Sequence, residues 1–453
     1  MDGKLDGTRH RRKVSSASSG SGNATPTRIC ILGGGFGGLY TALYLRRFSL
    51  LKSNKCEITL VEQKDRFLFT PLLYELVTDE LQAWEIAPSY QKLLRNTNIR
   101  FCQETIQEVD LQTRQVKLQC GEVLAYDYLV LAVGGETRLE GVPGAGTYAQ
   151  TFRSLADVEL LKQQLREFEL SEQKQIRIAI AGAGPNGVEL ACKIADRLQE
   201  RGQVLVIDRG NQILKTFSAH TQAAAHRALS ARGVRVELET SINRIEPDQI
   251  TLVRDGQIDT LPVDLVFWTA GTRQIDWVRE LDCQHNRQGQ LISCPTLQLV
   301  DYPEVFALGD LAEIYNPRGA RVPATAQAAF QQADCAARNI WAAIAGRPLR
   351  RFRYLHLGEM VTLGKGAAAV SSFGLNLEGR LASITRQVVY LQRLPTVPHR
   401  LQVVRNWLHQ AIRRVVLTVW KWLTAIRRQL VKLGFKSLGK RRLAANYSRR
   451  SKY

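Results

Sequence analysis

The feature that most constrains the fold is a strand–glycine–helix pattern that occurs twice, about 150 residues apart. In the first copy, the apolar run 28–32 precedes the glycine-rich segment 33–38, and a helical pattern follows. In the second, the run 177–181 precedes the segment 182–187 and another helical pattern. This order is the fingerprint of a dinucleotide-binding unit. The sequence therefore predicts an α/β fold with two Rossmann-like domains.

The glycines of each copy have separate roles. The first permits a tight turn, the second lets the backbone approach a pyrophosphate, and the last lets the helix pack closely on the strand. The phosphates are expected at the helix N-terminus, where free N–H groups and the helix dipole favour anions. The cofactor-binding residues predicted on the two loops are Gly33, Gly35, Phe36, Gly37, Gly38, Gly182, Gly184, Pro185, Asn186 and Gly187.

An acidic residue follows the next predicted strand of each copy. Glu62 comes after the run 57–61, and Asp208 comes after the run 204–207. A carboxylate at this place can accept hydrogen bonds from an adenosine ribose. Asp208 favours NADH, because a carboxylate repels the 2′-phosphate of NADPH, but the neighbouring Arg209 could offset that repulsion. Both nucleotides therefore stay open.

The positive charge is concentrated near the C-terminus. The net charge is +20, and residues 379–453 contain 18 Lys and Arg but no Asp or Glu. Residues 401–433 also show an apolar stripe at helical spacing, formed by Leu401, Val404, Leu408, Ile412, Val415, Val419, Leu423, Ile426, Leu430 and Leu433. An apolar stripe beside a basic face with tryptophans predicts a helix in the interface of an anionic membrane.

Two other interpretations of this tail compete with membrane binding. The stripe could pack on the protein's own body or on a second subunit, so a homodimer is possible. The final basic run, 440–452, could bind nucleic acid, but no reading module accompanies it and we expect no nucleic-acid partner. The chain has no run of roughly 18 apolar residues, so we expect no transmembrane helix.

The ends and the cysteines add further expectations. Residues 1–27 lack the apolar segment of a secretory signal, and we expect a disordered leader, with a transit peptide as the alternative. The eight cysteines are scattered, without C-x-x-C pairs or metal-ligand spacing. We therefore expect a reducing compartment, no disulfide framework and no metal site.

Five further segments resemble one known family, the type II NAD(P)H dehydrogenases, which are single-subunit, non-pumping NAD(P)H:quinone oxidoreductases. The resemblance covers residues 28–375. Its segments are 69–75 with Thr70 and Pro71, 126–135 with Ala132 and Gly134, 264–271 with Gly271, 305–310 with Gly309 and Asp310, and 326–331 with Ala326, Gln327 and Gln331. Residues 83–88, after residues 76–78, resemble the cyanobacterial and plastid branch that reduces demethylphylloquinone during phylloquinone synthesis.

The resemblance implies which cofactor each loop binds. FAD would lie on the first loop with Glu62 and Asp310, and NADH or NADPH on the second with Asp208. It also implies a membrane quinone of the naphthoquinone or plastoquinone class as the electron acceptor. The protein would be peripheral on the cytoplasmic or stromal face of a plasma or thylakoid membrane.

The resemblance further implies a split flavin domain. The expected parts are a leader (1–27), a flavin domain in two pieces (28–145 and 272–375), a nicotinamide domain inserted between them (146–271) and a basic amphipathic tail (376–453).

Three residues are candidates for catalysis. Glu189, one turn into the second helix, is expected to orient the nicotinamide and couple protonation; alternatively, the helix dipole merely favours a carboxylate there. Gln327 and Gln331 lie four residues apart, on one helix face, and their amides could donate to a quinone carbonyl. A polar surface stripe is the alternative for this pair.

Two other functions compete with this interpretation. A sulfide:quinone oxidoreductase shares the fold, but it would need reactive cysteines beside the flavin and has no use for the second fingerprint. A flavin-bearing redox sensor without turnover is the other alternative.

Overall fold

The structure is a computed structural model that describes residues 26–48, 56–413 and seven further positions up to residue 428. Almost all of the expected leader and all of the final basic run, 440–452, lie outside the described residues. So do Val415, Val419, Leu430 and Leu433 of the expected apolar stripe.

The first sheet has five parallel strands, ordered β19-β7-β1-β2-β3. They are β1 (Thr27–Leu32), β2 (Cys56–Val61), β3 (Ile99–Cys102), β7 (Tyr128–Leu131) and β19 (Val305–Ala307). The central strands are almost continuously apolar, as expected for a parallel sheet that helices cover on both faces. The glycine loop leads from β1 into α1 (Phe36–Leu45), which packs on α9 (Ala326–Ile344).

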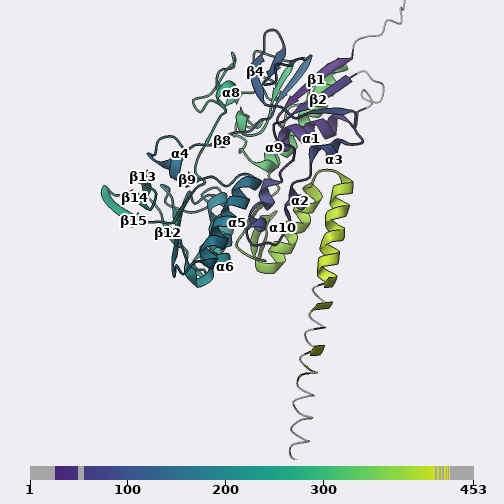
Figure 1. Cartoon of the computed structure of the whole chain (residues 1–453). Coiled ribbons are helices and arrows are strands. Elements are labelled where there is room, and N and C mark those ends of the chain that lie inside the picture. The colour runs from purple at the N-terminus through teal and green to yellow at the C-terminus, as the bar shows by residue number, and fades with distance from the viewer. Residues whose placement is uncertain are drawn as a thin grey trace, which may run out of the picture.

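The second sheet repeats this design with the order β12-β11-β10-β16-β9. Its strands, all paired in parallel, are β9 (Ala149–Gln150), β10 (Ile176–Ala181), β11 (Gly202–Ile207), β12 (Arg235–Glu237) and β16 (Leu265–Trp268). Its helices are α5 (Leu155–Leu170), α6 (Pro185–Leu198), which follows the second glycine loop, and α7 (Ala219–Ser230). Figure 1 shows the two units beside each other, and the predicted fold class is confirmed.

Three antiparallel sheets of three strands complete the body. They are β4–β6 (Ile106–Asp110, Gln115–Leu118, Val123–Ala125), β13–β15 (Ser241–Ile245, Gln249–Arg254, Gln257–Pro262) and β21–β23 (Glu359–Thr362, Ala368–Ser372, Leu375–Glu378). The short helices are α2 (Ala83–Ile86), α3 (Tyr90–Leu94), α4 (Ala145–Tyr148) and α8 (Asp276–Arg279). Single 3-10 turns are η2 (Thr70–Leu72), η3 (Tyr74–Leu76), η4 (Gln199–Arg201) and η5 (Gly309–Leu311).

The chain crosses between the two units at two short strands. β8 (Glu136–Thr137) leaves the first unit, and β17 (Thr272–Arg273) returns beside it in antiparallel pairing. After the return, β18 (Leu291–Ile292) pairs with β20 (Ala312–Glu313), and β19 inserts beside β7. A strand from the C-terminal half of the chain, β19, therefore completes the first sheet.

The C-terminal part begins with α10 (Gly379–Arg393) and continues as a helix over residues 397–413. This part packs on the body, because Arg386, His399 and Val403 are buried. The opposite side of the last helix is exposed, including Leu401 and Leu408. No helix within the described ranges is long and apolar enough to cross a membrane.

One contact in each loop requires glycine. A Cβ on Gly38 would lie 1.8 Å from the Gly33 carbonyl oxygen, and a Cβ on Gly187 would lie 1.9 Å from that of Gly182. The turn and the helix cannot move apart, because the glycine loop joins them and is anchored to the sheet. By contrast, a Cβ on Gly184 would meet no atom within 4 Å.

This difference predicts opposite results for two single-methyl variants. Gly187→Ala should lower the free energy of unfolding by roughly 2 kcal/mol or more, because helix and turn must separate. Gly184→Ala should leave the stability of the nucleotide-free protein nearly unchanged and weaken nucleotide binding instead. Chemical denaturation with and without NADH measures both. Equal stability of the two variants would contradict the close helix–turn contact.

Candidate active site

The first glycine loop is fastened to the acid that the sequence singled out. The Gly34 N–H donates to Glu62 Oε2 (2.7 Å), and the Lys64 N–H donates to Glu62 Oε1 (3.1 Å). The Tyr90 hydroxyl donates to the Gly34 carbonyl (2.7 Å). A Cβ at Gly35 would meet nothing within 4 Å, so the loop leaves room for a pyrophosphate to approach the backbone. This cradle fits a dinucleotide.

The second loop repeats this arrangement almost atom for atom. The Ala183 N–H donates to Asp208 Oδ2 (2.7 Å), and the Gly210 N–H donates to Asp208 Oδ1 (2.6 Å). The space beside Gly184 is open as well. Each acid therefore both holds its loop and keeps lone pairs available for ribose hydroxyls. The second cradle also fits a dinucleotide.

Asp310 lies in η5, immediately after β19. The preceding Gly309 N–H donates to Gln332 Oε1 (2.7 Å), which fixes the turn. Burial raises the pKa of Asp310, and the nearby positive charge of Arg153 acts in the opposite direction. The carboxylate of Asp310 has no hydrogen-bond partner among the described residues, so it is available to a ligand. No periodic pattern or motif in the sequence marks Arg153.

The other predicted cofactor residues lie at turns and strand ends. Ala132 follows β7 and donates its N–H to Leu32 O (2.8 Å). Gly134 and Gly271 have positive φ at the two crossings, and Ala326 opens α9 behind the capping residue Thr325. Thr70 and Pro71 form η2.

Glu189 is buried in a cluster of three charges. Its Oε1 accepts from the Thr362 N–H (2.8 Å) and lies 3.4 Å from an Arg386 guanidinium nitrogen. The same guanidinium pairs with Glu75 and donates to the Pro71 carbonyl (2.5 Å). The three charged side chains come from α6, η3 and α10. Sequence analysis found Glu189 but missed Glu75 and Arg386, which are distant along the chain.

Burial controls the protonation of this cluster. It raises the pKa of Glu189 to about 7, although Arg386 and the Thr362 N–H act in the opposite direction. Two carboxylates thus surround one guanidinium, and one oxygen of Glu75 has no partner among the described side chains. Near neutral pH, Glu189 can therefore both hold and release a proton.

Gln327 and Gln331 lie on one face of α9, as predicted, but their amides already contact the segment 354–358. Gln331 Nε2 donates to the Leu355 carbonyl (2.8 Å), and its Oε1 accepts from the N–H of the same residue (2.9 Å). Gln327 Nε2 donates to Gly358 O (3.2 Å), and its Oε1 accepts from Tyr354 and Leu357. Each amide therefore keeps one N–H for a ligand, and both position segment 354–358.

Aromatic rings fill the space between α1 and α10. Phe69 contacts Phe36 and Tyr390, with ring centroids 5.3 and 5.4 Å apart, and the Arg386 guanidinium lies 4.9 Å from the Tyr390 ring. The Tyr40 hydroxyl donates to the Arg393 carbonyl, which fastens the end of α10 to α1. The charged cluster is thus enclosed on this side by apolar rings.

The cysteines are unpaired, and the buried ones among them resist ionisation. All eight lie in the described part of the chain and are free thiols. Burial raises the pKa of Cys30, Cys192 and Cys335 to about 12, so their reactive thiolates are disfavoured. Within the described residues, no His, Cys, Asp and Glu side chains gather in a group that could hold a metal ion.

The fold and the two open cradles define a flavoprotein class that binds two dinucleotides. Residues 27–333 match the family model described as pyridine nucleotide-disulphide oxidoreductase. The chain is 47% identical over 385 residues to a demethylphylloquinone reductase of Synechocystis sp., an alignment that covers 84% of this chain and 95% of that protein. It therefore belongs to the pyridine nucleotide-disulphide oxidoreductase family, and within it to the type II NAD(P)H:quinone oxidoreductases.

A further relative and two solved structures are similar to this chain over most of its length. The chain is 39% identical to the alternative NAD(P)H-ubiquinone oxidoreductase C1, chloroplastic/mitochondrial, of Arabidopsis thaliana, with 84% of this chain and 80% of that protein aligned. Among solved structures, NDH2 of Plasmodium falciparum in complex with NADH matches with a TM-score of 0.74 at 19% identity, covering 84% and 97% of the two chains. The sulfide:quinone oxidoreductase of Aquifex aeolicus matches at 0.69 and 19%, covering 80% and 89%. At such identities the structures show the fold alone.

The raised pKa of Glu189 predicts a pH-dependent stability. The folded state binds this proton more tightly than the unfolded chain, so stability is lost as pH rises from about 4.5 to about 7, by roughly 3 kcal/mol. Glu189→Gln lacks that ionisation, so its unfolding free energy minus that of the unaltered protein should increase across this range. Denaturant titrations at pH 5, 6, 7 and 8 measure it. Glu200→Gln, an exposed carboxylate just after the same helix, is the control. A difference independent of pH would refute the assignment.

Proposed function

We propose that the protein oxidises NAD(P)H and reduces a membrane naphthoquinone of the demethylphylloquinone type, using FAD. The observation that carries this proposal is the pair of matched open cradles, each closed by a carboxylate that accepts a hydrogen bond from its glycine loop. The relative at 47% identity, which is named a demethylphylloquinone reductase, supports the quinone class.

In this proposal FAD occupies the cradle of Gly33–Gly38, with Glu62 and Asp310, and the nicotinamide nucleotide occupies that of Gly182–Gly187, with Asp208. The flavin domain comprises 28–145 and 272–375, and 146–271 is the inserted nicotinamide domain. When bound, the flavin accepts hydride and passes electrons on, while the protein provides position and electrostatics.

Glu189 supplies the proton that quinone reduction needs. Its pKa of about 7 lets it carry a proton at neutral pH and recover one after each turnover. Arg386 compensates the negative charge left behind, because its guanidinium contacts both Glu189 and Glu75. The protein groups around the cluster keep bulk water out, since all three side chains are buried.

Gln327 and Gln331 orient the quinone. Each has one amide N–H left to donate to a quinone carbonyl, and neither adds charge to an apolar site. Their bonds to segment 354–358 hold these donors in place.

The flavin provides a direct test. NADH or NADPH added without oxygen should bleach the flavin absorbance, and a naphthoquinone should restore it. Gln327→Leu combined with Gln331→Leu should leave bleaching intact and slow reoxidation by roughly tenfold or more, the loss of one or two hydrogen bonds. Stopped-flow absorbance separates the two steps.

Gln163→Leu, on the exposed face of α5, is the control. If the flavin bleaches but does not recover when quinone is added, the protein would be a redox sensor without quinone turnover. If the flavin does not bleach at all, the dehydrogenase assignment would be refuted. Normal reoxidation in the double variant would show that the glutamines act only on segment 354–358.

The membrane contact is proposed on the C-terminal side. α10 turns Arg386 inward and exposes Leu381, Ile384 and Val388 on its other side, and the last helix exposes Leu401, Leu408 and Ile412. Both helices lack acidic residues, so their basic side chains favour anionic lipid by about 1 kcal/mol each. The protein would thereby be peripheral on the cytoplasmic or stromal face of a membrane that contains the quinone. A second copy of the chain is the competing occupant.

Replacing exposed leucines tests this surface. Leu401→Ser with Leu408→Ser should reduce co-sedimentation with phosphatidylglycerol-containing vesicles several-fold, because apolar area no longer enters the interface. Leu170→Ser, on α5 and even more exposed than Leu401 and Leu408, is the control. Unchanged sedimentation together with a shift from dimer to monomer in light scattering would indicate subunit contact in place of membrane contact.

A further inference from the structure

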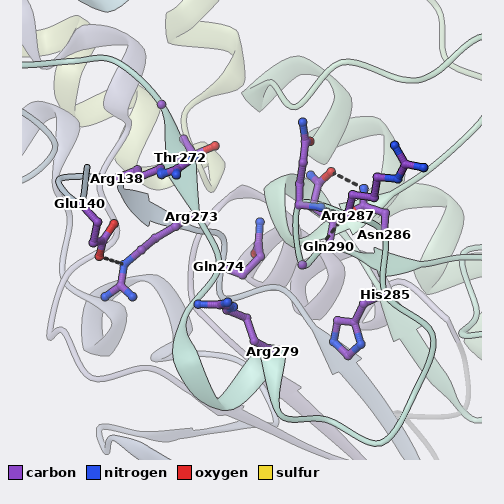
Figure 2. Close-up of a pocket in the computed structure, with 13 residues that line it drawn as sticks. Arg138, Glu140, Thr272, Arg273, Gln274, Arg279, His285, Asn286, Arg287 and Gln290 are labelled. Atoms are coloured by element: carbon purple, nitrogen blue, oxygen red, sulfur yellow. Dashed lines mark hydrogen bonds and ion pairs between the residues drawn. The ribbon is translucent and has the colours of Figure 1, made fainter. Parts of the chain in front are cut away.

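A separate cavity of about 1010 Å³ lies where the chain crosses between the two units. One wall is formed by β17, the residues beside it and two residues that follow β8, Arg138 and Glu140. The other is formed by Arg279 at the end of α8 and by the loop 285–290. Figure 2 shows Arg138 and Arg273 on one side of Gln274, and His285 and Arg287 on the other. We call this cavity the arginine pocket.

The arginine pocket has an excess of positive charge. Four arginines line it, against one carboxylate, Glu140. That carboxylate is already used, since Arg273 pairs with Glu136, Glu140 and Asp276. The guanidinium groups of Arg138, Arg279 and Arg287 have no carboxylate or hydrogen-bond partner among the described residues. Three arginines without a carboxylate partner therefore line the same hollow.

The floor of the pocket carries an unsatisfied polar atom. Gln274 is only 3% exposed. Its Nε2 donates to the Asp310 carbonyl (3.1 Å), but its buried Oε1 has no partner. Leaving such a buried acceptor without a donor is unfavourable. A ligand hydroxyl or amino group would satisfy it.

We propose that the arginine pocket binds a phosphate-bearing anion of nucleotide size. Guanidinium groups recognise phosphate with paired hydrogen bonds, and the amides of Gln274 and Gln288 suit hydroxyl and base groups. The volume is that of a small-molecule site. The pocket shares only Gly271 with the residues assigned to FAD and NAD(P)H, so its ligand is a third, separate one.

The pocket also contacts the flavin end of the protein. Gln290 Nε2 donates to the Asp310 carbonyl (2.8 Å), beside the bond from Gln274. A ligand that recruits Gln274 Oε1 therefore acts on the turn that carries Asp310. Under the proposed function, occupancy of the pocket perturbs the flavin, and flavin binding is affected reciprocally.

Calorimetry of the full-length protein with bound FAD tests the site without turnover, so its outcome is independent of the quinone assignment. ATP is the probe, and inorganic pyrophosphate at equal ionic strength is the second ligand. We expect one saturable site. Arg279→Ala with Arg287→Ala should weaken ATP binding roughly tenfold or more and leave the flavin content unchanged. Arg95→Ala with Arg244→Ala removes two exposed, unpaired arginines elsewhere and should not alter it.

Gln274→Leu separates the parts of the ligand. It should weaken ATP more than pyrophosphate, because pyrophosphate lacks a hydroxyl or amino donor for Oε1. No saturable ATP binding, or equal losses in both double-arginine variants, would overturn the proposal. Loss of ATP binding at saturating NADH would also overturn it, since the pocket would then belong to the nicotinamide site.

Discussion

Arg386 lies fully buried, with its guanidinium between Glu75 and Glu189. A charge in such a place is tolerated only when it is paired and hydrogen-bonded, and removing one partner of a buried pair typically costs about 3–5 kcal/mol. The three side chains belong to the turn η3 of the first unit, the helix α6 of the second unit and the C-terminal helix α10. Their mutual attraction therefore fixes how these parts meet, and Arg386 also acts on the protonation of Glu189.

The rest of the architecture applies one local solution twice. Besides the matching loops, each unit joins its first strand to a later one by an arginine–aspartate pair: Arg28 with Asp127, and Arg177 with Asp264, both at 3.0 Å. In both, the aspartate also accepts from the arginine's own backbone N–H (2.7 Å). One glycine-rich turn alone is a weak sequence signal. The repetition of the whole unit makes both fingerprints informative. Because the two cradles have the same fold, they differ only in the acid that closes each one and in the residues beside it.

Much of the candidate site could be predicted because its signals are local. The glycines and the acid of each copy lie within one strand–turn–helix–strand unit, and the structure brings Glu62 and Asp208 into contact with their glycine loops. Glu189 was found by its place one turn into α6. Glu75, Arg153 and Arg386 were missed, because nothing near them in sequence marks their role: Arg386 contacts residues 311 and 197 positions away. Gln327 and Gln331 were predicted only in part. Their spacing predicted a shared helix face, but it did not predict that they contact segment 354–358.

The amino-acid order alone determined two dinucleotide cradles, the α/β class and a basic, amphipathic C-terminus, because backbone turns, strand periodicity and charge are properties of short segments. Only the tertiary structure decided which face of the C-terminal helices is buried, where the arginine pocket forms and which carboxylates share a guanidinium. Those outcomes depend on desolvation and on contacts between distant segments. Neither exists until the chain is packed.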